Sequence, residues 1–105
     1  MAWIFLLVAG LLEVAGASGL KHLAERFSLL LLIVTAAAMI ASLGALYWSM
    51  TRLPLGVAYP IWTGIGSIGS VIVGMTVFGH HPGPAGFAGI SLLLAGMVLL
   101  GFDTH

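Results

Sequence analysis

Residues 1–20 read MAWIFLLVAGLLEVAGASGL, and Glu13 is the sole ionisable side chain in this stretch. The stretch is otherwise apolar and matches the roughly 20 residues that a helix needs to cross a bilayer. A carboxylate at mid-membrane depth costs about 2.5–3.5 kcal/mol on insertion scales, so such residues are usually kept for a function. The sequence therefore predicts a transmembrane helix whose central feature is Glu13.

Small residues surround Glu13 at helical spacing. Ala9 and Gly10 precede it by four and three positions, and Gly16 and Ala17 follow it by three and four. Residues at these spacings lie on one helix face, so another helix or a ligand can approach the carboxylate closely. The alternative is a protonated Glu13 that makes a structural hydrogen bond between helices. The stripe of small residues and the cost of burial favour a binding role.

Composition excludes several classes of protein. The chain has 105 residues, of which 61% are hydrophobic and 6% charged, too few charges to cover a soluble domain. It has no cysteine, which excludes disulfides and thiolate sites. Three Lys and Arg residues exclude a basic face for nucleic acid. No nucleophile–base pair or metal constellation is present, so we expect no enzyme, metal or cofactor, but a single membrane domain over residues 1–105.

The sequence Ala15-Gly16-Ala17 resembles the small-residue cleavage site of a secretory signal peptide. No positive charge precedes the apolar stretch, however, and Glu13 lies within it. Signal peptides carry a positive amino-terminal region and an apolar core, so we expect this segment to remain as a membrane span.

Polar and helix-breaking residues divide the chain into four predicted spans. Residues 53–102 contain no Asp, Glu, Lys or Arg and are too long for one crossing of about 20 residues. The segment GHHPGP at residues 79–84 breaks this run, because prolines and glycines stop a helix. The apolar runs do not alternate as a membrane barrel requires. We therefore predict an all-α membrane protein with four transmembrane helices, at residues 2–20, 28–50, 54–78 and 85–102.

Positive charges are divided almost evenly between the two membrane faces. Lys21 and Arg26 follow the first span, whereas Arg52 lies on the other side with the amino terminus. Because such charge bias sets orientation, a chain with little bias is expected to insert both ways round. Alternating access commonly relies on two inverted repeats around a midplane site. Two oppositely oriented copies would supply these repeats, so we predict an antiparallel, dual-topology homodimer.

The third predicted span contains a second informative segment, PLGVAYPIWTGIGSIGS, at residues 54–70. Four residues of this segment are spaced i, i+3, i+4 and i+7 and therefore share one helix face: Tyr59, Trp62, Thr63 and Gly66. Aromatic rings attract cations through their π faces, and their OH and NH groups can orient a carboxylate. The alternative is that both aromatic residues belong to an interfacial belt. Their shared face, with a lone Glu on another span, favours binding.

The same span is suited to bending and close packing. Pro60 removes one helix hydrogen bond. Gly64 and Gly66 allow the helix to flex and let a neighbour approach, as Gly10 does in the first span.

The chain resembles the small multidrug resistance (SMR) family of proton-coupled cation exporters along essentially its whole length. The match covers the length, the four spans, the pair Glu13-Val14 and the segment LPLGVAYPIWTGIG at residues 53–66. Members of this family work as antiparallel dimers. The resemblance implies that Glu13 of both subunits binds either protons or one organic cation. It also implies a bacterial inner-membrane location, with the proton motive force as energy source and no cofactor.

Further residues take their expected roles from the resemblance. The residues expected to surround Glu13 and contact substrate are Ser42, Tyr59, Trp62 and Thr63. Gly89 and Gly96 in the fourth span are similar to the dimerisation stripe of the family, and their i, i+7 spacing permits close helix contact. For Ser42, ordinary helix packing is the alternative.

Two features point to different branches of the family. The residues WTGIG at 62–66 are similar to the guanidinium-exporting branch. That branch usually has a Trp three residues after its glutamate, where this chain has Gly16. A Gly at this place looks more like the branch that exports quaternary ammonium and aromatic cations, or like members of heterodimeric pairs. Loss of an indole beside the carboxylate is expected to widen the pocket and remove a donor to Glu13, which would favour bulky hydrophobic cations. We predict a mixed range of guanidinium-type and hydrophobic substituted cations.

Two other hypotheses stay open at this point. In the first hypothesis, the chain is one subunit of a heterodimeric SMR pair. In the second, it is a membrane interaction protein that transports nothing. The even charge distribution argues against the first, and the Glu13 stripe with the aromatic face argues against the second. His80 and His81 lie in a Gly/Pro loop without carboxylate or Cys partners for a metal. His22 and His105 are expected at the membrane interface.

Overall fold

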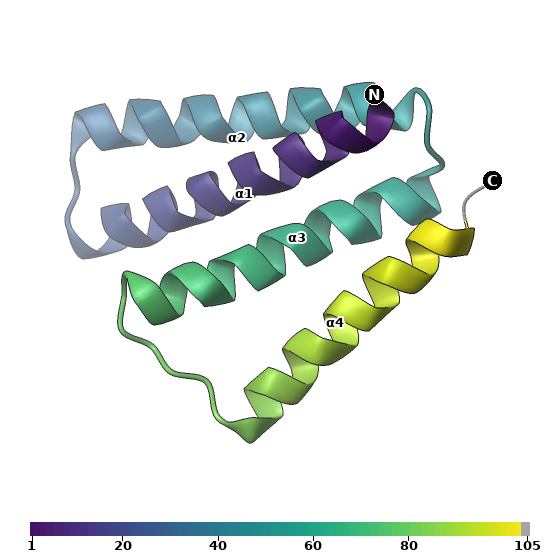
Figure 1. Cartoon of the computed structure of the whole chain (residues 1–105). Helices are drawn as coiled ribbons and strands as arrows, with labels where there is room; N and C mark the ends of the chain where they lie inside the picture. Colours follow the sequence, from purple (N-terminus) through teal and green to yellow (C-terminus); the bar gives the residue numbers. More distant parts are fainter. Residues whose placement is uncertain (104–105) are drawn as a thin grey trace.

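A computed structural model of the chain describes residues 1–103 and shows four helices (Figure 1). They are α1 (Ala2–Glu25), α2 (Leu29–Met50), α3 (Leu55–Thr76) and α4 (Pro84–Asp103). Each contains a segment long and apolar enough to cross a membrane, and residues 1–103 include no β-strand. The predicted all-α fold with four transmembrane helices is confirmed. The expectation for His105 lies outside the described residues.

The first helix continues past its predicted apolar limit and ends at Glu25. Lys21 and Glu25 lie one turn apart on it, with Nζ and Oε1 3.5 Å apart and both side chains exposed. The helix is longer than its apolar stretch because charged residues extend it beyond the lipid core. Arg26 is extended, with φ of −152°, and the Ser28 hydroxyl then accepts a bond from the Leu31 amide at 3.4 Å, which begins α2.

The other two connections are also short. The Ser49 carbonyl accepts bonds from the amides of Arg52 and Leu53 at 3.1 and 2.9 Å, and Pro54 then precedes α3. Between α3 and α4, Gly79 has φ of +71°, a region that glycine occupies without strain. The predicted break after the third span is confirmed, and the helix before it ends slightly earlier than expected.

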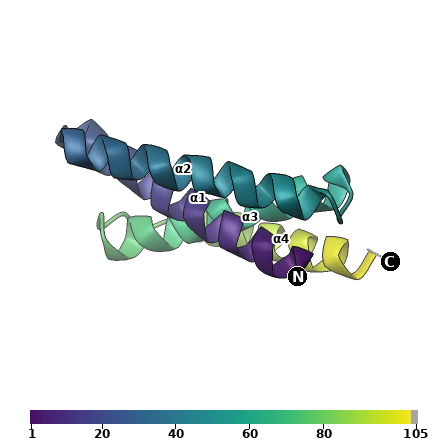
Figure 2. The same cartoon turned by 90° about the horizontal axis from the view of Figure 1, so that it is seen from above.

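The helices form a thin layer with principal extents of 45 × 34 × 16 Å. In this layer α1 packs against both α2 and α3, and α3 also packs against α4. Figure 1 shows α4 leaning away from α3, and Figure 2 shows the layer from above. No residue of α4 is buried. The fourth helix is therefore much less covered than the other three.

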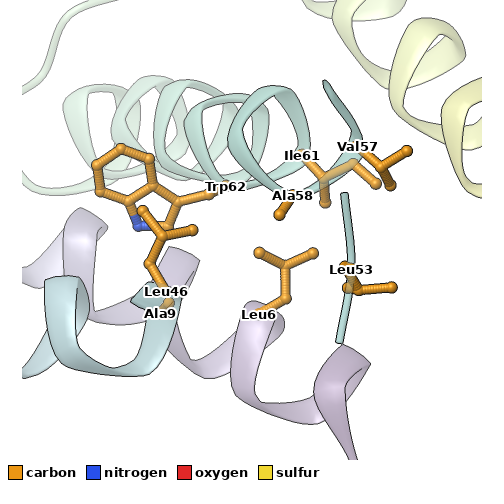
Figure 3. Close-up of a cluster of buried hydrophobic side chains, with 8 residues drawn as sticks. All are labelled: Leu6, Ala9, Leu46, Leu53, Val57, Ala58, Ile61 and Trp62. Atoms are coloured by element: carbon orange, nitrogen blue, oxygen red, sulfur yellow. The ribbon is translucent and has the colours of Figure 1, made fainter. Parts of the chain in front are cut away.

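A buried apolar cluster joins the first three helices. Its members, drawn in Figure 3, are Leu6, Ala9, Leu46, Leu53, Val57, Ala58, Ile61 and Trp62. They come from the first half of α1, the end of α2 and the first half of α3, together with the turn before α3. Lipid is as apolar as these side chains, so close packing rather than removal from water holds the helices together. This cluster fixes the face of α3 that lies opposite α1.

Candidate functional site

Glu13 lines an open cleft between α1 and α3. The cleft has a volume of about 330 Å³ and is lined by Glu13, Trp62, Thr63, Gly66, Ser67 and Ser70. Helix α1 supplies the carboxylate, and α3 supplies every other lining residue. Three residues predicted to share a face of the third span therefore lie beside Glu13, namely Trp62, Thr63 and Gly66.

Gly66 makes room for the Glu13 side chain. A Cβ atom added at residue 66 would lie 3.0 Å from Glu13 Cγ, and Gly66 itself is buried. That distance is shorter than ordinary van der Waals contact between carbon atoms. The carboxylate can enter the cleft because residue 66 has no side chain.

A chain of two hydrogen bonds ties the indole of Trp62 to the helices around it. The Trp62 Nε1–H donates to Ser42 Oγ at 3.0 Å, and the Ser42 hydroxyl donates to the Ala9 carbonyl at 2.7 Å. Ser42 is fully buried and lies behind the indole instead of lining the cleft. Because Ala9 is one turn before Glu13, this link joins α1, α2 and α3 beside the carboxylate.

Tyr59 lies next to Trp62 on the same face of α3 and outside the cleft lining. The centroids of the two rings are 5.4 Å apart, with an angle of 50° between their planes. The Thr63 hydroxyl donates back to the carbonyls of Tyr59 and Pro60, at 3.0 and 3.1 Å. The predicted aromatic pair is therefore in contact, and Trp62 is the member that reaches the cleft.

Gly16 faces α2 and does not line the Glu13 cleft. A Cβ atom at residue 16 would lie 2.7 Å from Met39 Cγ, and Gly16 is buried. The spacing of three residues places Gly16 near Glu13 along the helix, but helix α2 approaches on this side. The widening of the pocket expected from the missing indole is therefore not seen in the cleft lining, because Met39 lies where that side chain would begin.

Two other predicted packing glycines lie at helix contacts. A Cβ atom at Gly10 would lie 2.7 Å from Ile65 Cβ, so α1 and α3 approach closely there. One at Gly64 would lie 2.8 Å from Met97 Cγ, in the contact between α3 and α4.

Gly89 and Gly96 stand at an uncovered face of α4. No atom lies within 4 Å of a Cβ atom built at either residue. Both line an open, largely apolar cleft of about 300 Å³ between α3 and α4, together with Pro60, Leu92, Leu93, Met97 and Leu100. Nothing in residues 1–103 fills the space above these glycines.

Ser67 and Ser70, which no sequence motif had marked as candidates, also line the Glu13 cleft. They follow Thr63 by four and seven residues and so continue the helix face of that residue. This spacing is the sequence signal that could have identified both serines.

Residues 1–103 contain no group of three or more His, Cys, Asp and Glu side chains that could hold a metal ion.

Comparison with known proteins gives the family. The family described as Small Multidrug Resistance protein matches residues 1–93. The "Guanidinium exporter" of Citrobacter freundii is 46% identical to this chain over 105 residues, which is 100% of both proteins. The protein of the same name from Escherichia coli strain K12 is 42% identical over the same full length. These names describe transporters rather than enzymes.

The match extends over nearly the whole chain, and each of the four helices is able to span a membrane. Together with the bacterial origin of the exporters it resembles, this places the chain in the inner membrane as an integral protein. It belongs to the small multidrug resistance family.

Proposed function

We propose that this protein exports small organic cations, guanidinium-type cations first among them, in exchange for protons. The observation that carries the proposal is the position of Glu13, a carboxylate in a membrane span that lines a cleft with an indole and three hydroxyl groups. An ionised carboxylate in this setting needs a cation, and a proton satisfies it equally. The names of the full-length relatives support guanidinium as the substrate class.

Trp62 is suited to hold the cation against Glu13. Its indole is fixed by the bond to buried Ser42, so its π face is held in place before a ligand arrives. A ring that is already ordered loses little freedom on binding, which raises affinity. Thr63 adds an oxygen acceptor for an N–H group of the substrate.

The exchange follows from competition for Glu13. A cation binds the ionised carboxylate and displaces protons, and protons displace the cation in turn. Net exchange results when the transporter opens to one side at a time and the empty, unprotonated form does not switch. The inward proton gradient then drives the cation out, with no cofactor needed.

The functional unit in this proposal is an antiparallel homodimer. The even distribution of Lys21, Arg26 and Arg52 supports insertion in both orientations. A second copy would cover the open glycine face of α4, where Gly89 and Gly96 leave space for a neighbouring helix. Two oppositely oriented chains would also bring two Glu13 carboxyl groups to one central site.

The proposed substrate range is mixed. The relatives named for guanidinium export support planar cations, whereas the Gly16 found in place of a Trp favours bulkier hydrophobic ones. Because Gly16 lies against Met39, any effect of this position on substrate size acts through the contact between α1 and α2.

The test is substrate-induced current from the purified protein, alone in liposomes, with guanidinium and with tetraethylammonium. We expect currents that Glu13→Gln abolishes. The matched control is Glu25→Gln, which removes an exposed carboxylate at the end of α1 and leaves the current unchanged. Current that persists in Glu13→Gln would overturn the assignment. Absence of current for both cations would overturn a self-sufficient antiporter and favour an obligate partner subunit.

A further inference from the structure

We propose that the Glu13 cleft continues into a polar subsite, built by Ser67, Ser70 and Ser18, that binds a neutral hydrogen-bonding substituent on the cation. This inference rests on the proposed function, because it concerns which guanidinium-type cations the site prefers. It assigns a role to three serines that neither the family match nor the names of the relatives give.

The cleft does not end at Glu13. A second open cleft, of about 200 Å³, is lined by Ala17, Ser18, Lys21, Ser70, Val73, Gly74 and Phe78. Ser70 lines both clefts, so the two adjoin along the groove between α1 and α3. Ser70 lies one helical turn, about 6 Å along the axis, beyond the Gly66 position that Glu13 contacts. A two- or three-atom substituent on a cation held at Glu13 spans that distance.

The hydroxyl groups along this groove present oxygen acceptors. The Ser67 hydroxyl donates to the Thr63 carbonyl at 2.7 Å, and the Ser18 hydroxyl on α1 donates to the Val14 carbonyl at 2.7 Å. A hydroxyl has one proton and two lone pairs, so each of these oxygens can still accept a bond after donating its proton to the backbone. These oxygens can therefore accept hydrogen bonds from O–H and N–H groups of a ligand.

Ser70 adds a hydroxyl group that is free both to donate and to accept a hydrogen bond. Its side chain makes no hydrogen bond to another group within residues 1–103, and it is half-buried at the junction of the two clefts. The Ser70 hydroxyl can therefore either donate to a substituent or accept from one.

The far end of the groove limits the charge of the substituent. Lys21 lines that end, eight residues and about 12 Å along α1 from Glu13. A second ammonium on the ligand would approach this like charge, which disfavours it, because Glu25, the ion-pair partner of Lys21, lines neither cleft. The best match is a guanidinium head with a short neutral group that carries an O–H or N–H donor, such as a hydroxyl or a carboxamide.

The experiment compares two cations of nearly equal size, 2-hydroxyethylguanidinium and propylguanidinium, which differ by an OH in place of a CH₃. Substrate-induced currents of the purified protein in liposomes give a KM for each. We expect the hydroxyl compound to have a KM about fivefold lower, the worth of roughly one net hydrogen bond. An equal or lower KM for propylguanidinium in the wild-type protein would overturn the inference.

Variants then assign the preference to the serines. Ser70→Ala is expected to bring the ratio of the two KM values close to one, and Ser70→Thr, which keeps the hydroxyl, to preserve most of the preference. Thr76→Val is the matched control, because its hydroxyl donates to the Ile72 carbonyl on the same helix but lies outside both clefts. An unchanged ratio in both Ser70→Ala and Ser67→Ala would overturn the subsite.

The inference and the proposed function fail in different ways. Absence of a Glu13-dependent current with guanidinium itself would overturn the proposed function. A Glu13-dependent guanidinium current without discrimination between the two substituted cations would overturn the polar subsite alone.

Discussion

Helices α1, α2 and α3 contrast with α4 in the way they are held. The first three share a buried cluster and the hydrogen-bonded link from Trp62 through Ser42 to Ala9. The fourth has no buried residue and packs mainly on α3. The Glu13 cleft therefore lies within this packed group of helices, while the surface proposed to meet a second copy lies on a helix that the group barely covers.

A single chain therefore contains the Glu13 cleft but does not enclose it. Glu13 faces a cleft that is open, and the protein is a layer only 16 Å thick in its smallest dimension. Substitutions on α4 should therefore act on assembly, whereas substitutions around Ser42 and Gly66 should act on binding inside a correctly assembled protein.

The largest effect is expected from Gly96→Leu. The added side chain occupies the open face of α4, where a neighbouring helix would approach, so dimer formation and transport should both be lost. The control is Val98→Leu, which adds bulk on a different face of α4, lined by Ser91, Ala95 and Leu99. Cross-linking in liposomes and substrate-induced current measure the two properties. A Gly96→Leu variant that still forms dimers and transports would contradict the assignment of α4 to dimer assembly.

Gly66→Ala should impair binding without dissociating the dimer. Its Cβ atom would press on Glu13 Cγ at 3.0 Å and shift the carboxylate from its position in the cleft. A shift of this kind costs on the order of 1–3 kcal/mol, which corresponds to a roughly fivefold or greater rise in the KM for guanidinium. Gly56→Ala on the same helix, where no atom lies within 4 Å of the new Cβ, should leave the KM unchanged. Equal KM values in the two variants would contradict the role given to Gly66.

Ser42→Ala should have the smallest effect of the three. It leaves the indole N–H of Trp62 without its acceptor, so the ring loses the bond that orients it while the other members of the apolar cluster stay packed. The loss of about 1 kcal/mol should raise the KM for guanidinium roughly fivefold with dimer formation intact. Ser42→Thr, which keeps the hydroxyl, should recover part of the affinity. If Ser42→Ala instead unfolds the protein in detergent, the hydroxyl is structural rather than an aid to binding.

The number and approximate extent of the helices could be read from the sequence, because apolar length and helix-breaking residues are local properties. The charged end of α1, which extends the helix to Glu25, was not predictable from apolar length. The face that carries Trp62, Thr63 and Gly66 was also predictable, since spacing along a helix fixes which residues share a face. These signals required no knowledge of how the helices pack.

The orientation of individual residues toward neighbouring helices was not predictable in the same way. Membrane helices are apolar all round, so periodicity does not tell which side meets which neighbour. Spacing along α1 therefore predicts one pocket for Gly16 and Glu13, although Gly16 faces α2 and Glu13 faces α3. The resemblance implies a place for Ser42 around Glu13, whereas in the structure its hydroxyl accepts from Trp62 and lies outside the cleft lining.

Because a single chain is a thin, open layer, the export capacity of a cell would depend steeply on how much of the protein it makes. Under the proposed dimer, a single chain is an incomplete transporter, so the number of working units depends on encounters between two chains in the membrane. While most chains are unpaired, the number of working units rises with the square of chain abundance, by mass action. A modest increase in expression would then raise export capacity out of proportion to the protein made.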